Sequence, residues 1–224
     1  MIIDAIVPAR NEGLTVADVV EACHGCTYVR EVIVVDDGSD DDTADRAAAA
    51  GAKVVRRESD GSKAHAMEAG VEATDADSIL FVDADCLGLT SAHLDAICEP
   101  FVERRAVMSL GTFDYGIWNW IVLRFPPTTG ERIVPRWVFE AVPPDEREGY
   151  TIELMLNSVI AEGRLPTTAR VMRGVTHRTK RDKFGPVEGW RRTWEMFWDL
   201  VTLIRRNLRV RTYWFYLRDL TIER

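Results

Sequence analysis

The sequence lacks the features that would place it at once in several large classes of protein. No run of about 18 apolar residues occurs in its 224 residues, so we expect no transmembrane helix. The first four residues, Met1 to Asp4, contain no basic segment, so we expect no secretory signal. No GxGxxG loop follows the first apolar run and no GxxxxGK[ST] loop occurs, which argues against a dinucleotide-binding fold and a P-loop enzyme.

Cysteine is scarce. The chain has 4 cysteines, too few for a disulfide scaffold. Cys23 and Cys26 form a CxxC pair, but the pair follows a helical pattern that Gly25 ends, so we interpret it as structural. Cys86 and Cys98 are expected to be small buried residues. Cysteine usage and the missing leader together predict a cytoplasmic protein, with the inner face of the cell membrane as an alternative location.

Charge is unevenly distributed along the chain. Residues 1–163 contain 13 Lys and Arg against 30 Asp and Glu, whereas residues 164–224 contain 15 against 6. The net charge of −8 argues against a nucleic-acid-binding protein. The basic C-terminal part suits a phosphate-rich partner such as a nucleotide, a lipid headgroup or an anionic membrane, or it is a solvated helix face.

Strand and helix patterns alternate in the first half. Apolar runs predict strands over residues 2–8, 31–35, 53–55, 78–82 and 106–110. Capping residues and helical spacing predict helices over 15–23, 42–50, 62–73 and 91–101. Short connections and right-handed crossovers then predict an α/β fold with a mostly parallel sheet and helices on both faces.

Acidic residues follow the predicted strands. Asp36 and Asp37 come after the second strand, Asp83 and Asp85 after the fourth, and Glu12 soon after the first. The carboxyl ends of parallel strands share one edge of a sheet, where functional groups collect. Carboxylates that lie so close together repel one another unless a cation or hydrogen bonds compensate their charge. Carboxylate oxygens beside a phosphate group favour Mg²⁺ or Mn²⁺ as that cation. Each motif alone is equally compatible with a turn or a strand end.

Three segments in this order resemble a family 2 glycosyltransferase with the GT-A, Rossmann-like fold. They are IVPARNE at 6–12, VIVVDDGSDDDT at 32–43 and LFVDAD at 80–85. The resemblance covers about the first half of the chain. It implies a hexosyltransferase domain over 1–187, with a nucleotide-sugar half at 1–110 and an acceptor half at 111–187, followed by a helical tail at 188–224.

The resemblance assigns donor and metal residues. The implied nucleotide-sugar ligands are Pro8, Arg10, Glu12, Asp37, Lys63, Asp83 and Ala84. Asp37 occupies the position that reads the base, usually uracil, whose imide N–H a carboxylate can accept. Asp85 is the implied ligand of a Mn²⁺ or Mg²⁺ ion that neutralises the departing diphosphate. A late histidine, His177, completes the metal site in some relatives and suits Mn²⁺ better than Mg²⁺.

The second half resembles the family more loosely. The segment from Thr129 to Arg136 resembles the acceptor-side motif SGxRAxR, and GYTIE at 149–153 resembles a helix start beneath the sugar. Acceptor-side residues are expected to be Gly111, Thr112, Gly130 and Arg132. Asp85 and Glu153 are the expected catalytic carboxylates. The sequence has no convincing copy of the general base that many inverting members carry. A phosphate acceptor, which is already ionised, would need no base, and neither would a retaining reaction, so the anomeric outcome stays open.

The expected reaction is metal-dependent transfer of glucose from UDP-glucose to a phosphate-bearing acceptor, such as polyprenyl phosphate. A small phosphorylated acid resembling phosphoglycerate is the alternative acceptor. The sequence is also compatible with a sugar-nucleotide-binding protein that has no catalytic activity. A nucleotidyltransferase is less favoured, because the GxG[ST]R loop typical of that class is missing after the first strand.

The C-terminal segment suggests how the acceptor is reached. A basic loop at 178–185 is expected to close over the diphosphate. Residues 188–208 place aromatic and aliphatic side chains three and four apart, flanked by arginines, which predicts an amphipathic helix. That helix could lie on a membrane surface, on its own domain or on a second copy in a homodimer.

Overall fold

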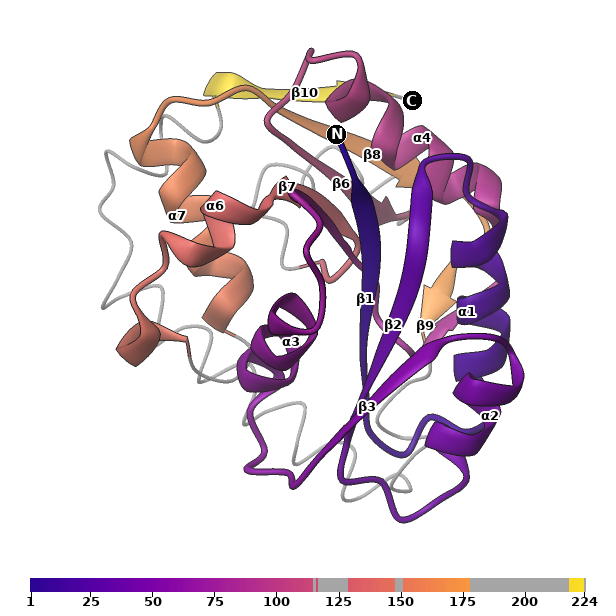
Figure 1. Cartoon of the computed structure of the whole chain (residues 1–224). Coiled ribbons are helices and arrows are strands. Elements are labelled where there is room, and N and C mark those ends of the chain that lie inside the picture. Colours follow the sequence, from indigo (N-terminus) through magenta and orange to yellow (C-terminus); the bar gives the residue numbers. More distant parts are fainter. Residues whose placement is uncertain (115, 117–128, 148–150, 178–217, 224) are drawn as a thin grey trace.

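The computed structural model describes residues 1–114, 116, 129–147, 151–177 and 218–223. Its first half alternates strands and helices as predicted, with ends that differ by a few residues (Figure 1). The elements are β1 (Ile3–Ala9), α1 (Val16–Gly25), β2 (Val29–Asp37), α2 (Thr43–Ala49), β3 (Lys53–Arg57), α3 (Lys63–Glu72), β4 (Ser78–Phe81), α4 (Ser91–Val102) and β6 (Met108–Phe113).

The second half adds strands on both sides of β6. The further elements are β7 (Arg132–Pro135), α6 (Arg136–Glu140), the 3₁₀ turn η2 (Pro144–Glu146), α7 (Ile152–Glu162), β8 (Thr167–Met172) and β10 (Leu220–Glu223). One sheet has the order β10-β8-β6-β7-β4-β1-β2-β3. Within it β7 runs antiparallel to both β4 and β6, and the other pairs are parallel. The sheet is therefore mostly parallel, as expected.

Side chains of the strands alternate between two apolar layers. Val32 and Val34 of β2 pack with α1 and α4, whereas Ile33 and Val35 pack with α3. Figure 1 shows α1, α2 and α4 on one face of the sheet and α3, α6 and α7 on the other. Both faces are thus covered, as the continuous apolar runs of β1 and β2 predicted.

Gly70 sets the position of α3 on the sheet. A Cβ there would lie 2.3 Å from Cγ2 of Ile6 on β1, so a side chain would push the helix outward. Close packing of α3 matters for the site because Lys63 is the first residue of this helix.

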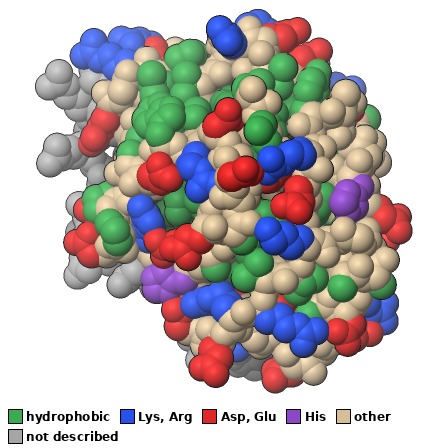
Figure 2. Space-filling view, viewed as in Figure 1, with side chains coloured by type: hydrophobic (Ala, Val, Ile, Leu, Met, Phe, Trp, Pro, Cys, Tyr) green, Lys and Arg blue, Asp and Glu red, His purple; other side chains and the backbone are tan. Residues whose placement is uncertain are grey.

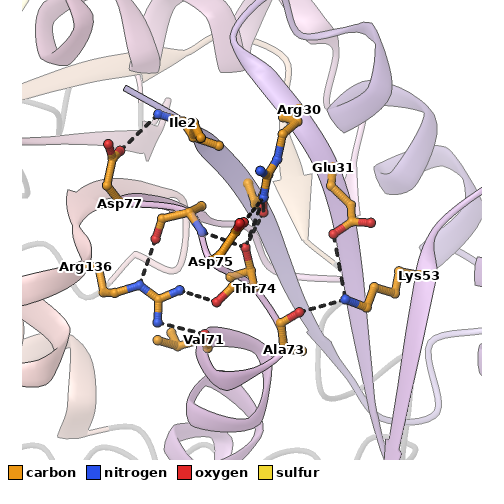
Figure 3. A network of polar contacts seen from close by, with 12 residues as sticks. Ile2, Arg30, Glu31, Lys53, Val71, Ala73, Thr74, Asp75, Asp77 and Arg136 are labelled. Carbon is orange, nitrogen blue, oxygen red and sulfur yellow. Dashed lines mark hydrogen bonds and ion pairs between the residues drawn. The ribbon is translucent and has the colours of Figure 1, made fainter.

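The edge of the sheet at the amino ends of β1 and β4 is closed by polar contacts (Figure 3). Arg30 makes a two-pronged ion pair with the buried carboxylate of Asp4 and also contacts Asp75. Arg136 donates to the carbonyl oxygen of Val71, in the last turn of α3, and to those of Thr74 and Ala76 in the loop that follows. The arginine that ends the acceptor-side motif therefore caps a helix on the side away from the strands' carboxyl ends.

The C-terminal residues correct one expectation. Residues 188–224 were expected to be helical, but Leu220–Glu223 form β10, parallel to β8. Arg170 of β8 forms an ion pair with Glu223 of β10 at 2.6 Å, which helps to hold β10 at the edge of the sheet. The β-branched pair Thr221 and Ile222 suits a strand. The predicted helix at 188–208 and the basic loop at 178–185 lie outside the described residues.

Charges of both signs are interspersed on the face of the molecule drawn in Figure 2. In the part of the chain that the structure describes, no helix has the length and apolarity needed to cross a bilayer.

Candidate active site

The loops after β1 and β2 are tied together by hydrogen bonds. Asn11 has a φ of 57° in the left-handed region, which asparagine tolerates better than most residues. Its backbone N–H donates to Oγ of Ser39 at 3.0 Å, and its side-chain oxygen accepts from the backbone N–H of Asp40 at 2.8 Å. The backbone N–H of Glu12 donates to Oγ1 of Thr43 at 2.8 Å. These contacts hold the predicted nucleotide loop at the carboxyl edge of the sheet.

The predicted residues of this loop differ in exposure. Pro8 is half-buried, Arg10 is exposed to solvent and Glu12 is buried. Ala84 is buried too, and its carbonyl oxygen accepts a 2.7 Å hydrogen bond from Oγ1 of Thr15. This bond joins the β1 loop to the Asp83-Ala84-Asp85 segment, so two of the three motifs meet.

Asp37, the predicted base reader, ends β2 beside β3. Its carboxylate pairs with Arg57 and accepts from Oγ of Ser59 at 2.8 Å. The residue is 6% exposed, so its side chain is held in one orientation rather than free in solvent. Sequence reasoning missed Arg57. The sequence predicts that the strands containing Asp37 and Arg57 are neighbours, but it does not give their register, which is what places Arg57 opposite Asp37.

Lys63 links two of the predicted carboxylates. It is the first residue of α3, after the capping residue Ser62, and its Nζ lies 2.5 Å from Asp83 and 2.7 Å from Glu153. Burial on its own would lower the pKa of Lys63, but the two carboxylates outweigh burial and raise it. Lys63 therefore stays charged and brings the DxD segment, α3 and α7 together at one point.

Gly130 lies directly against Asp83. A Cβ on Gly130 would lie 2.2 Å from the carboxylate carbon of Asp83, so only glycine leaves that side chain in place. Gly130, predicted for the acceptor side, thus borders Asp83, which is predicted to bind the nucleotide sugar.

The remaining predicted acceptor-side residues are buried. Arg132 is 0% exposed and donates to the carbonyl oxygen of Glu153 at 3.1 Å and to Asn157 at 3.0 Å. A Cβ on Gly111 would lie 2.7 Å from Ile97 and Met172, and Thr112 donates to the carbonyl oxygen of Arg170. In this structure Arg132, Gly111 and Thr112 contact other parts of the protein and leave no surface for an acceptor.

A short antiparallel ladder brings the predicted metal residues close in the fold. It joins β5 (Cys86–Leu87) to β9 (Thr176–His177) and pairs Cys86 with His177, one position from Asp85. His177 is exposed, and its ring meets that of Phe113 edge-on, with the two ring centroids 5.0 Å apart. The described residues contain no group of three side chains that could hold a metal. A metal here would therefore need ligands from the phosphates of a substrate, as Mg²⁺ and Mn²⁺ commonly use.

Glu131 is a buried carboxyl group that sequence reasoning missed. It is 0% exposed, and it accepts from Sγ of Cys86 at 3.0 Å and from the hydroxyl of Thr129. Burial and the charge of Asp83 raise the pKa of Glu131 to about 7. It occupies the variable position of the acceptor-side motif, so neither the motif nor its spacing indicates a role for it.

Replacing Glu131 by Gln should change how stability depends on pH. Folding raises the pKa of Glu131 from 4.5 to about 7. At a pH between these two values the protein therefore takes up a proton when it folds. Stability from the protonated group is full below pH 4.5 and is lost as the pH rises through 7. The loss should reach ~3 kcal/mol and be missing in Glu131→Gln. Urea unfolding with EDTA at pH 4.5 to 8 measures it.

The exposed Glu21 of α1 provides the matched control. Glu21→Gln should keep the pH profile of the wild type. If Glu131→Gln also kept that profile, Glu131 would be ionised throughout, and its assignment as a protonated group would be wrong.

Comparison with known proteins supports the family assignment. Residues 4–147 match the sequence model of glycosyl transferase family 2. Glucosyl-3-phosphoglycerate synthase of Mycolicibacterium smegmatis is 40% identical in an alignment of length 109, which covers 45% of this chain and 36% of that protein. The 4,4'-diaponeurosporenoate glycosyltransferase of Staphylococcus haemolyticus is 34% identical in an alignment of length 117, which covers 48% of this chain and 31% of that protein. The match spans about a third of these relatives.

Solved structures share the fold. Glucosyl-3-phosphoglycerate synthase of Mycobacterium tuberculosis with Mn²⁺ and UDP-glucose has a TM-score of 0.72 at 22% identity, covering 92% of this chain and 78% of that one. The same enzyme with Mn²⁺, UDP and phosphoglyceric acid has a TM-score of 0.69 at 25% identity, covering 79% and 70%. This likeness shows the shared fold. The family match over residues 4–147 shows that the chain belongs to glycosyl transferase family 2.

Proposed function

We propose that this protein transfers glucose from UDP-glucose to a small phosphorylated acid of the phosphoglycerate type, with Mn²⁺ or Mg²⁺ bound at the sheet edge. The observation that carries the proposal is the cluster around Lys63, which joins Asp83 and Glu153 beside Asp85 and the β5–β9 ladder. A cationic lysine among carboxylates at the strands' carboxyl ends suits a metal-bound diphosphate ester.

The donor set fits a divalent metal. One carboxylate from Asp85 and one imidazole from His177 suit Mn²⁺, with the diphosphate supplying further oxygens. When bound, this metal would act as a Lewis acid that neutralises the departing UDP. Glu153 is proposed to accept a hydrogen bond from a hydroxyl group of the sugar, while Lys63 keeps its carboxylate in position.

The choice of acceptor is supported by the relatives. The synthases from Mycolicibacterium and Mycobacterium are named for a phosphoglycerate acceptor, which favours the small phosphorylated acid over polyprenyl phosphate. The staphylococcal relative is named for a different acceptor, so the acceptor is the part of the proposal that most needs a test. The division of the chain at residues 110 and 187 stays a prediction.

A transfer assay tests the proposal. Radiolabelled UDP-glucose and Mn²⁺ would be incubated with the protein and either 3-phosphoglycerate, polyprenyl phosphate or no acceptor. We expect a glucosylated phosphoglycerate, and little product with the lipid. Transfer to polyprenyl phosphate alone would replace the proposed acceptor. Donor binding without turnover under any of these conditions would instead indicate a sugar-nucleotide-binding protein.

A further inference from the structure

Asp37 and Arg57 are direct neighbours across two parallel strands. The register of β2 and β3 pairs Asp37 with Arg57 at the carboxyl end of both strands. The Arg57 guanidinium binds one oxygen of the Asp37 carboxylate, and the hydroxyl of Ser59 donates to the other oxygen at 2.8 Å. The side chains of Arg57 and Asp37 are 19% and 9% exposed. The carboxylate is therefore fixed in plane and direction before any ligand arrives.

The orientation of the Asp37 carboxylate determines which base it can bind. Each carboxylate oxygen has two lone pairs, and Arg57 and Ser59 take one on each oxygen, so a lone pair of fixed direction remains on each. Uracil presents one imide N–H, which such a lone pair can accept. The N3 atom of cytosine is an acceptor, which a carboxylate does not bind.

Arg57 also connects this position to α3. A second guanidinium nitrogen lies 3.0 Å from Asp60, which contacts Nδ1 of His65 at 2.5 Å and accepts from the backbone N–H of Ser62. Ser62 caps the helix that begins with Lys63. The hydrogen bond to Asp60, outweighing burial, and the contact with Asp37 raise the pKa of Arg57, which therefore stays charged.

We infer that Arg57 is a positioning residue that makes Asp37 select uracil over cytosine in the donor nucleotide. The inference rests on the proposed function, because it concerns the base of the proposed UDP-sugar. Arg57 acts through Asp37 and needs no contact of its own with the donor.

The test compares UDP and CDP binding by calorimetry, with Mn²⁺ present, in the wild type and in Arg57→Gln. We expect the Kd for UDP to rise about tenfold and the UDP-to-CDP preference to fall by the same order. In transfer assays the KM for UDP-glucose should rise while kcat changes less than about twofold, since the reacting groups are untouched.

Arg56→Gln is the matched control. Arg56 is the adjacent residue of β3, pairs with Asp45 and is 67% exposed at its side chain, so its loss should leave both affinities unchanged. Arg57→Lys keeps the charge but not the forked geometry and should recover part of the preference for UDP. Thermal melting checks that each variant is folded. If Arg57→Gln melts below the assay temperature, the comparison uses Arg57→Lys, which should then lie between the wild type and no preference.

The outcomes separate the inference from the proposed function. A wild type that prefers UDP, with the same preference in Arg57→Gln or, where that variant is unfolded, in Arg57→Lys, would overturn the inference and leave the function intact. A wild type that binds neither nucleotide would overturn both.

Discussion

Replacing Asp85 by Ala is expected to lower kcat/KM for UDP-glucose by on the order of 10³-fold and to leave the fold intact. Asp85 is half-buried at the carboxyl edge of the sheet, next to Cys86 of β5, which pairs with His177. If Asp85 holds the metal, its loss removes the charge that stabilises the leaving diphosphate, which is worth several kcal/mol in the transition state. The variant should therefore fail in turnover and in metal-supported donor binding together.

Asp75→Ala is the control for this variant. Asp75 is an aspartate at the opposite edge of the sheet, where it pairs with Arg30 and is 82% exposed at its side chain (Figure 3). Its loss should change kcat/KM less than twofold, since exposed pairs contribute about 0–1 kcal/mol. Steady-state kinetics over a range of Mn²⁺ concentrations compares the two variants. Activity of Asp85→Ala that returns to the wild-type level at high Mn²⁺ would show that Asp85 only tightens metal binding.

Replacing Lys63 by Met is expected to lower the free energy of unfolding by about 2–3 kcal/mol and to abolish measurable transfer. Breaking a buried ion pair by removing one partner costs about 3–5 kcal/mol, and the cost here is lower because Asp83 is partly exposed. The side chains of Lys63, Asp83 and Glu153 are 16%, 29% and 6% exposed. Without the lysine, two carboxylates and the nearby Glu131 face one another with less compensating charge.

Lys53→Met separates this effect from the loss of any lysine. Lys53 lies on β3, is 48% exposed at its side chain and stands 3.9 Å from Glu31. The free energy of unfolding of Lys53→Met should lie within about 0.5 kcal/mol of that of the wild type, and the variant should retain transfer activity. Urea unfolding at pH 7 measures both variants. Equal stability of Lys63→Met and Lys53→Met would mean that Asp83 and Glu153 do not depend on Lys63.

The first half of the fold could be predicted because its signals are local. Apolar runs, capping residues and short connections fix the elements from β1 to α4 within a few residues, except the two-residue strand β5. The positions of β7 and β10 depend on pairing between distant segments. The four residues of β7 run antiparallel between β4 and β6, and Leu220–Glu223 join β8 from beyond residue 217. Neither pairing leaves a periodic pattern in the sequence.

The site divides in the same way. Asp37 is the last residue of β2, and Asp83 and Asp85 follow β4, so the topology alone brings them to one edge. Glu131 and Arg57 act through contacts that need the exact packing, and no spacing in the sequence indicates them. Arg132 shows that recognising a motif does not reveal where its side chain lies. The motif was recognised, but the side chain is buried and donates to the carbonyl oxygen of Glu153 instead of being open to an acceptor.

The Mn²⁺ dependence of UDP binding, measured by calorimetry in the wild type and in Asp85→Ala, tests the central claim most directly. The claim is that the carboxylates at the sheet edge hold a divalent metal against the diphosphate of the donor. In the wild type the affinity for UDP should rise at least about tenfold when EDTA is replaced by Mn²⁺, by linkage between the two ligands. In Asp85→Ala the two affinities should be nearly equal. Equal UDP affinity with EDTA and with Mn²⁺ in the wild type would contradict the claim.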